Sequence, residues 1–295
     1  MNDNVDNNVN SNANVTVSAL LTVTDEALVT LGLDLGSLFT KAALLVGGDS
    51  AHVEGELLAS EVIPTTGTVA DQLGGLIEAL LASAGLSSDR LDGIVATGRG
   101  AALAPDVDFA EESMACIGAA VRRLLPGVEI VLDVGGQSIT AIRLDGAGAV
   151  VDFMRNDKCA SGTGRYLEVM GQALGVSIEA LDGCAALARQ VAPISSQCGV
   201  FVESEVITHL NDGVAPEAVA AGLCEAVART VVSQARRFCG GAPETFSITG
   251  GVARLEAVVR RVREQLGGGL VPFPLDPLLA AAYGAAVLAA EAEEA

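Results

Sequence analysis

Two cysteines lie in loops whose composition suits chemistry. Cys159 lies in the segment Asn156–Gly164 (NDKCASGTG), and Cys198 lies in Pro193–Phe201 (PISSQCGVF). Both segments consist mainly of small and polar residues, and both run directly into a helical pattern. The unpaired N–H groups and partial positive charge of a helix N-terminus stabilise a thiolate or an anionic cluster. We therefore interpret these two cysteines as ligands rather than as packing residues.

The other four cysteines lie in a different setting. Cys116, Cys184, Cys224 and Cys239 occur in apolar helical runs or at a helix end, where core or incidental thiols are expected. A C-x₂-C pair is absent from the sequence, which disfavours a zinc finger or a ferredoxin-type run.

A strand–turn–strand pattern near the N-terminus carries residues suited to phosphate binding. Residues 30–45 read as two strands joined by a glycine turn that carries Asp34, Gly36, Ser37 and Thr40. Glycines let the backbone approach a phosphate closely, and hydroxyl and N–H groups can bind it. Asp34, at a strand end, could hold Mg²⁺ through water. Taken alone, the pattern also fits an ordinary hairpin with a polar turn.

The same pattern recurs in residues 129–142, where Asp133 is followed by Gly135, Gly136 and Gln137. A third glycine site, Gly250–Gly251, follows a strand pattern near the C-terminus and suits an adenosine or ribose-phosphate contact. A repeated architecture of this kind predicts two lobes that face one nucleotide.

Alternating strand and helix patterns must position these segments. Val/Ile runs alternate with Ala/Leu helical stretches, which favours an α/β fold. Beyond the hairpins, we expect a strand over 93–98 and helices over 68–84, 109–125, 255–266 and 278–290. The Asn-rich residues before about position 24 read as a disordered tail that ends in a weak strand-like run over 15–23.

Composition excludes several functions. The 295 residues include 17 basic and 37 acidic side chains, for a net charge of −20. Non-specific binding to nucleic acid or to an anionic membrane needs a basic surface, so neither partner is expected. No signal-peptide pattern is visible, and the longest apolar run, 278–290, is too short to span a bilayer. We expect a cytoplasmic protein whose cysteines are free thiols or metal ligands.

Together, these segments resemble the actin, sugar-kinase and heat-shock ATPase superfamily. The two cysteine loops and the run Thr249–Ala253 (TGGVA) narrow the resemblance to the activator ATPases of 2-hydroxyacyl-CoA dehydratases, a family that includes the ATPase subunits of benzoyl-CoA reductases. The resemblance extends from Leu31 to Ala290. It implies a two-lobed, actin-like α/β ATPase with ribonuclease H-like lobes and the nucleotide between them.

The resemblance also implies domain boundaries and site residues. Residues 1–28 would form the tail, 29–127 plus 275–295 the first lobe, and 128–274 the second. Asp34, Asp133 and Gln137 would be catalytic, positioning Mg²⁺ or the attacking water. The implied ATP/ADP contacts are Gly36, Ser37, Thr40, Lys41, Gly135, Gly136, Gly250 and Gly251.

In this family the two cysteines bind one [4Fe-4S] cluster shared by two identical subunits, so the resemblance implies that Cys159 and Cys198 are the cluster ligands of a homodimer. The implied activity is ATP-driven transfer of one electron at low potential, under anaerobic conditions. The electron would come from ferredoxin or flavodoxin and pass to a 2-hydroxyacyl-CoA dehydratase or a related reductase component.

Some residues depart from the family pattern. The second hairpin usually continues Gly-Gly-Gln-Asp-Ser-Lys, whereas this chain has Ser138, Ile139 and Thr140 after Gln137. An acidic and a basic residue are therefore missing beside the implied phosphate site. Three alternatives remain: the ATPase subunit of a benzoyl-CoA reductase-type complex, an N-acetyl-sugar-kinase-like enzyme without a cluster, and a non-enzymatic actin-like scaffold.

Overall fold

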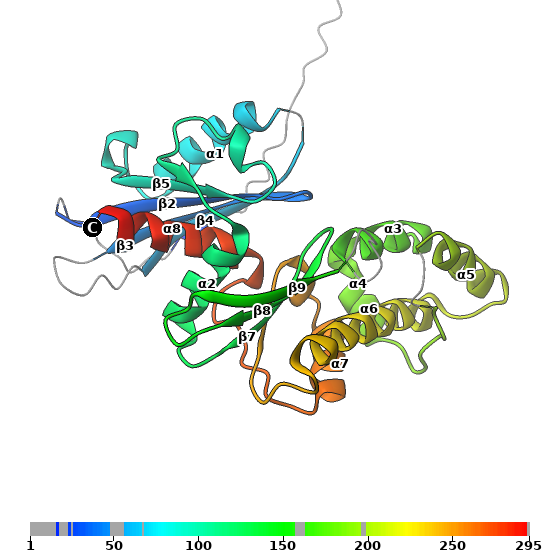
Figure 1. Ribbon diagram of the computed structural model, residues 1–295. Coiled ribbons are helices and arrows are strands. Elements are labelled where there is room, and N and C mark those ends of the chain that lie inside the picture. The colour runs from blue at the N-terminus through cyan, green and yellow to red at the C-terminus, as the bar shows by residue number, and fades with distance from the viewer. Residues whose placement is uncertain are drawn as a thin grey trace, which may run out of the picture.

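The computed structural model describes residues 16–17, 23–24, 26–47, 56–66, 68–156, 163–195 and 199–293. In these ranges the chain forms two mixed β-sheets with helices packed against both (Figure 1). The predicted α/β class is confirmed.

The first sheet has the strand order β1-β4-β3-β2-β5-β6. Strands β2, β3 and β4 form an antiparallel meander, and β5 and β6 add to it in parallel with β2. Both β2 and β3 are buried almost along their whole length, as their continuous apolar runs predict. The strands are β1 (Thr16–Val17), β2 (Leu28–Leu35), β3 (Phe39–Gly47), β4 (Glu56–Pro64), β5 (Gly93–Thr97) and β6 (Phe109–Ala110).

The second sheet has the order β10-β7-β8-β9, with β7, β8 and β9 antiparallel and β10 parallel to β7. It therefore repeats, in shorter form, the hairpin-plus-parallel-strand arrangement of the first. Its strands are β7 (Ile130–Val134), β8 (Ile139–Leu144), β9 (Val150–Arg155) and β10 (Ser247–Thr249).

Helices cover the sheets on both faces. On the first sheet, α1 (Val69–Ser83) covers one face and α8 (Ala280–Glu293) the other. The second sheet has α2 (Ser113–Leu124) on one face and a helical layer on the other, so α2 and α8 lie between the two sheets (Figure 1). That layer contains α3 (Gly164–Leu174), α4 (Ile178–Ala186), α5 (Gly199–Asn211), α6 (Pro216–Cys239) and α7 (Glu256–Leu266).

The crossing of α2 and α8 depends on a glycine. A Cβ atom at Gly284 would lie 1.7 Å from the backbone carbonyl oxygen of Cys116. The two helices therefore meet backbone to backbone, which no larger residue permits. Cys116 itself is fully buried, so its predicted role as a core thiol is confirmed.

The helix predicted over 109–125 is wrong in its first turn. Phe109 and Ala110 instead form β6, because their backbone pairs with Val95 and Ala96 at the edge of the sheet. The helix α2 begins only at Ser113. An available sheet edge outweighs local helix propensity here.

Strand β1, which pairs with β4, falls inside the predicted strand-like run over 15–23.

The two sheets follow the predicted lobes. Strands β2 to β6 of the first sheet lie in the range 29–127 apart from Leu28, and the strands of the second sheet lie in 128–274. The domain boundaries themselves stay a prediction. Over the part of the chain that the structure describes, no helix combines the length and apolar character needed to cross a membrane.

Candidate active site

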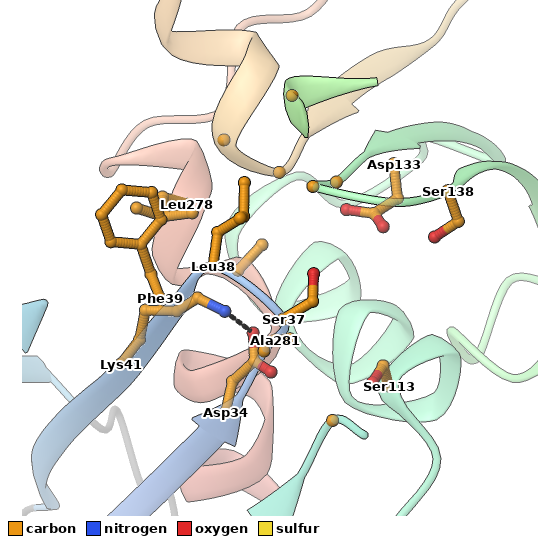
Figure 2. A pocket seen from close by; sticks show the side chains of 18 of the residues that line it. Asp34, Ser37, Leu38, Phe39, Lys41, Ser113, Asp133, Ser138, Leu278 and Ala281 are labelled. Carbon is orange, nitrogen blue, oxygen red and sulfur yellow. Dashed lines mark hydrogen bonds and ion pairs between the residues drawn. The ribbon is translucent and has the colours of Figure 1, made fainter. Parts of the chain in front are cut away.

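A cleft of about 620 Å³ lies between the two sheets. Two hairpin turns face each other across it: residues 34–41, here called the first turn, and residues 133–140, the second turn. Figure 2 shows Asp34 on one wall and Asp133 on the other. Of the residues predicted to bind nucleotide or act in catalysis, the lining contains Asp34, Gly36, Ser37, Lys41, Asp133, Gly135, Gly136, Gln137, Gly250 and Gly251.

The two turns have the same backbone geometry. The N–H of Gly36 donates to the carbonyl of Phe39 at 3.1 Å, and the N–H of Gly135 donates to the carbonyl of Ser138 at 2.9 Å. Donor and acceptor hold equivalent positions in the two hairpins. The recurrence in the sequence is therefore a recurrence of structure.

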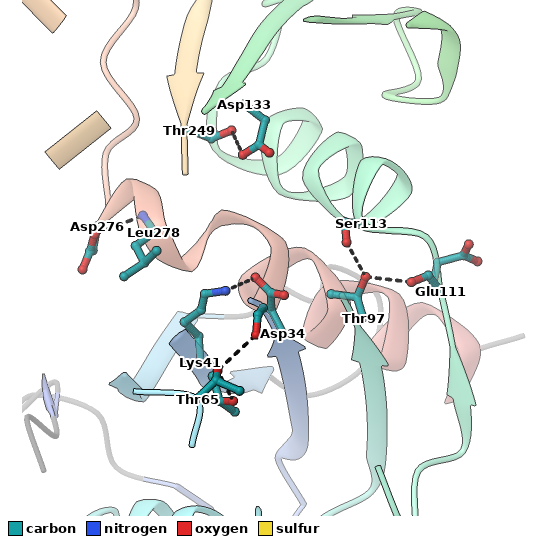
Figure 3. Close-up of polar contacts among 12 residues, drawn as sticks. Asp34, Lys41, Thr65, Thr97, Glu111, Ser113, Asp133, Thr249, Asp276 and Leu278 are labelled. Atoms are coloured by element: carbon teal, nitrogen blue, oxygen red, sulfur yellow. Dashed lines mark hydrogen bonds and ion pairs between the residues drawn. The ribbon is translucent and has the colours of Figure 1, made fainter. Parts of the chain in front are cut away.

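The carboxylate of the first turn has a basic partner. Lys41 lies directly across the hairpin from Asp34, and its Nζ is 2.5 Å from Asp34 Oδ2, with both residues buried (Figure 3). Thr40 is also buried, and its Oγ1 lies 3.0 Å from Thr65 Oγ1. Thr65 in turn donates to the carbonyl of Gly36 at 3.1 Å. The side chain of Thr40 thus supports the turn from behind and is not part of the cleft lining.

The carboxylate of the second turn has a neutral partner. Thr249 Oγ1 donates to Asp133 Oδ1 at 3.0 Å (Figure 3). Burial raises the pKa of Asp133 to about 6, against the lowering effect of the Thr249 hydrogen bond. The position that faces Asp133 across the hairpin is Thr140, and Arg155 Nε donates to Thr140 Oγ1 at 3.2 Å. Behind the second turn, the cation thus comes from the next strand, β9.

Gly136 allows the second turn to approach its neighbours closely. A Cβ atom there would lie 2.9 Å from the side chain of Leu38 and 3.0 Å from Ser37 Oγ, so the two turns touch. The second turn also contacts the start of α3, where the N–H groups of Gly164 and Arg165 donate to the carbonyls of Gly135 and Gly136 at 3.0 and 2.9 Å. A displacement of the second turn would therefore move the start of α3 or break these two hydrogen bonds.

The third glycine segment lies beside the second turn. The N–H of Gly250 donates to the carbonyl of Pro277 at 2.9 Å, which joins β10 to the chain that leads into α8. Beyond it, Arg254 Nε donates to Asp276 Oδ1 at 2.8 Å, and Asp276 accepts from the N–H of Leu278 at 3.1 Å. This end of the cleft combines apolar and polar groups, as a nucleoside site requires.

Several lining residues were missed by sequence reasoning: Arg99, Glu111, Arg155, Glu179 and Arg254. For Arg99 a signal existed, because Gly98 and Gly100 flank it directly after a strand whose end lies beside that of β2. The others have no local signal, since each reaches the cleft through the packing of distant elements.

The predicted cluster ligands, Cys159 and Cys198, lie outside the described residues. The helices after them are present as expected: α3 begins at Gly164 and α5 at Gly199.

The pKa values of the cysteines inside the described ranges disfavour the thiolate form, which is the form that binds metal. Burial raises the pKa of Cys116 and of Cys224 to about 12, and it also raises the pKa of Cys184 and Cys239. The expectation of core or incidental thiols agrees with these shifts. No group of three or more His, Cys, Asp or Glu side chains within those ranges is arranged to hold a metal ion.

Comparison with known proteins gives the family. The BadF/BadG/BcrA/BcrD ATPase family matches residues 31–289. The activator of lactoyl-CoA dehydratase from Anaerotignum propionicum is 36% identical over 268 residues, which cover 90% of this chain and 99% of that protein. The 2-hydroxyisocaproyl-CoA dehydratase activator from Clostridioides difficile is 34% identical over 262 residues, covering 89% of this chain and 95% of the relative.

A solved structure agrees with these relatives. The activator of the 2-hydroxyisocaproyl-CoA dehydratase from Clostridium difficile, with bound ADPNP, superposes with a TM-score of 0.83 and 32% identity, covering 90% of this chain and 96% of that one. The predicted actin-like ATPase fold is thereby confirmed. With its two matching turns facing one cleft, the chain belongs to the BadF/BadG/BcrA/BcrD ATPase family.

Proposed function

We propose that this protein hydrolyses ATP to drive the transfer of one electron, at low potential, to a partner iron–sulfur enzyme of the 2-hydroxyacyl-CoA dehydratase kind. One observation carries the proposal. The second turn is hydrogen-bonded through its backbone to the first residues of α3, and α3 directly follows the segment that contains Cys159. Nucleotide binding and the cysteine segment are thus connected through one short helix.

The nucleotide part of the proposal uses the two turns. Backbone N–H groups around Gly36 and Gly135, with Ser37 and Lys41, would bind phosphate oxygens. Asp34 and Asp133 suit Mg²⁺, because this ion usually takes one or two carboxylates and completes its shell with phosphates and water. ATP hydrolysis needs positioning and charge compensation rather than a covalent nucleophile.

The cluster part rests on the chemistry of the donor set. A [4Fe-4S] cluster takes four thiolates, and this chain has two cysteines in polar sequence segments that precede α3 and α5, Cys159 and Cys198. A two-fold axis would supply the remaining pair from a second copy of the chain. When bound, such a cluster supplies a one-electron carrier, loaded by reduced ferredoxin or flavodoxin.

The residues of this chain would perform the coupling. Closure of the cleft on ATP would move the second turn, and the bonds from Gly164 and Arg165 to that turn would carry the movement into α3. Domain closure around a ligand is a common response of two-lobed folds. A reoriented α3 would change how the cysteine segment faces the partner enzyme.

Iron analysis under strict exclusion of oxygen tests the proposal. We expect a brown dimer with about four iron atoms and as many sulfides, an EPR signal on reduction, and ATPase activity. Cys159→Ser and Cys198→Ser should each abolish iron binding, whereas Cys239→Ser, a half-buried cysteine on α6, should retain it. Iron content that survives both loop substitutions would contradict the proposal, as would a colourless protein that phosphorylates an N-acetyl sugar.

The choice of partner needs a separate experiment. Reduced protein plus ATP should activate a 2-hydroxyacyl-CoA dehydratase that is inactive alone. Activation of a benzoyl-CoA reductase core instead would place the chain in the other branch of its family.

A further inference from the structure

The side chain of Arg99 reaches from the first sheet across the cleft to the second turn. Its Nη1 donates to Oε1 of Gln137 at 2.5 Å, and both side chains are exposed. Because the guanidinium group has only donors, the atom that faces it must be the amide oxygen. The bond therefore holds the amide of Gln137 turned toward Arg99 and uses one of the two lone pairs of its oxygen.

The backbone of Arg99 is fixed at the phosphate end of the cleft. Gly98 has a φ of +88°, and a Cβ atom there would lie 2.5 Å from Asp34 Oδ1. On the other side, the N–H of Gly100 donates to the carbonyl of Leu35 at 3.1 Å. The base of the Arg99 side chain is thus held beside the carboxylate of the first turn, and only its exposed end is free to change partners.

Two other cations of the cleft are already paired with carboxylates: Lys41 with Asp34, and Arg254 with Asp276. A third, Arg155, donates to the hydroxyl of Thr140 behind the second turn. Arg99 is bonded to a neutral amide. A guanidinium group binds a phosphate in charge-assisted, often bidentate bonds that are stronger than a bond to a neutral oxygen. A terminal phosphate placed between the two turns should therefore draw Arg99 away from Gln137.

We infer that Arg99 is a phosphate-responsive latch: it bonds to Gln137 when the cleft is empty and transfers to the terminal phosphate of a bound nucleoside triphosphate. The transfer releases the amide of Gln137, which can then turn toward the attacking water and accept a hydrogen bond from it. This inference rests on the proposed function, because it assumes that ATP binds in the cleft and is hydrolysed there.

Hydrolysis of the terminal phosphate follows the transfer of Arg99. The water oxygen bonds to the terminal phosphorus, the bond from phosphorus to the bridging oxygen breaks, and its electron pair leaves with ADP. One proton of the water stays on the attacking oxygen, and the other passes to a second oxygen of the released phosphate. With ADP alone in the cleft, Arg99 returns to Gln137, so the latch distinguishes the triphosphate from the diphosphate.

Calorimetric titration of the full chain with Mg²⁺ and either ADP or a non-hydrolysable ATP analogue tests the latch. In Arg99→Ala we expect the affinity for the analogue to fall by about tenfold, the usual loss for one charge-assisted hydrogen bond, and the affinity for ADP to stay nearly constant. Arg99→Lys, which keeps the charge, should recover part of the loss. Arg237→Ala, an exposed arginine on α6, is the matched control and should change neither affinity.

Gln137→Ala should change the affinity for the ATP analogue in the opposite direction to Arg99→Ala, or leave it unchanged. Removing the competing acceptor should leave the affinity for the analogue unchanged or raise it severalfold while hydrolysis slows. If Gln137→Ala weakens analogue binding as much as Arg99→Ala, the bond is merely structural and the latch is refuted. Equal loss of both nucleotides in Arg99→Ala, or no loss, also refutes it. A wild-type protein that binds no nucleotide would instead contradict the proposed function.

Discussion

The two turns of the cleft share their backbone geometry but differ in how their carboxylates are compensated. In the first turn Asp34 lies across the hairpin from Lys41, and the two form a buried ion pair. In the second turn the position equivalent to Lys41 is Thr140, and Arg155 stands one strand further away. Among the residues that the structure describes, Asp133 accepts its hydrogen bond from a neutral group, the hydroxyl of Thr249.

This difference assigns different physical roles to the two turns. The first is internally neutral, so its carboxylate has little need of a ligand to be stable. The second holds a poorly solvated carboxylate whose pKa is raised, and it is bonded to α3 through its backbone. A cation such as Mg²⁺ would relieve the second turn more than the first. We infer that the first turn is the fixed side of the site and the second the responsive side.

The largest effect is expected from breaking the ion pair. Lys41→Met leaves Asp34 as an uncompensated buried charge, which should lower the free energy of unfolding by about 3–5 kcal/mol. Asp34→Asn should also destabilise the protein, because it leaves Lys41 unpaired. Urea denaturation of both variants and of the double variant measures this. If the double variant is no more stable than the singles predict by simple addition, the ion pair does not couple the two residues.

Asp133→Asn should raise the free energy of unfolding at neutral pH, in contrast to the substitutions of the ion pair. Between pH 4 and about 6 the folded protein holds a proton on Asp133 that the unfolded chain has lost, so stability falls as pH rises through this window. At neutral pH the charged carboxylate costs up to about 3 kcal/mol, and Asp133→Asn should recover part of this while losing ATP hydrolysis. Denaturation midpoints across this pH range, without nucleotide, test it. A variant less stable than the wild type at pH 7 would reverse our comparison of the two turns.

A smaller effect is expected from the glycines. Gly136→Ala would push against Leu38 and Ser37 of the opposite turn, so it should weaken ATP binding by about tenfold, or 1.4 kcal/mol, with little change in stability. Gly36→Ala would instead press on the carbonyl of its own turn, at Phe39, and should lower stability. Gly146→Ala, where a Cβ meets open space, is the control.

Nucleotide titration and denaturation of these three variants separate the two effects. If Gly36→Ala and Gly136→Ala change ATP affinity and stability to the same extent, the glycines of the two turns do not have different roles.

Much of the fold was predictable because it rests on local patterns. The repeated hairpins appear as apolar strand runs interrupted by Asp and Gly, and the long helices have clear apolar faces or caps. One exception is the segment before Ser113, where a helical pattern lost to strand pairing with β5. Another is α6 (Pro216–Cys239), which was not among the predicted helices. The site was predictable where glycines mark it, and less so where single side chains such as Arg155 and Glu179 reach it from remote elements.

The sequence by itself determined the α/β class, the two turns with their aspartates and glycines, and the polar segments that contain Cys159 and Cys198. Each of these features is a local pattern of neighbouring residues. Only the tertiary structure decided that Lys41 neutralises Asp34 while Asp133 accepts from Thr249, that Thr40 lies behind its turn, and that Arg99 reaches Gln137. These facts depend on strand register and on the approach of one sheet to the other. The register is set by strand pairing within each hairpin. The approach of the sheets is set by the packing of α2 and α8 between them, which no single stretch of sequence specifies.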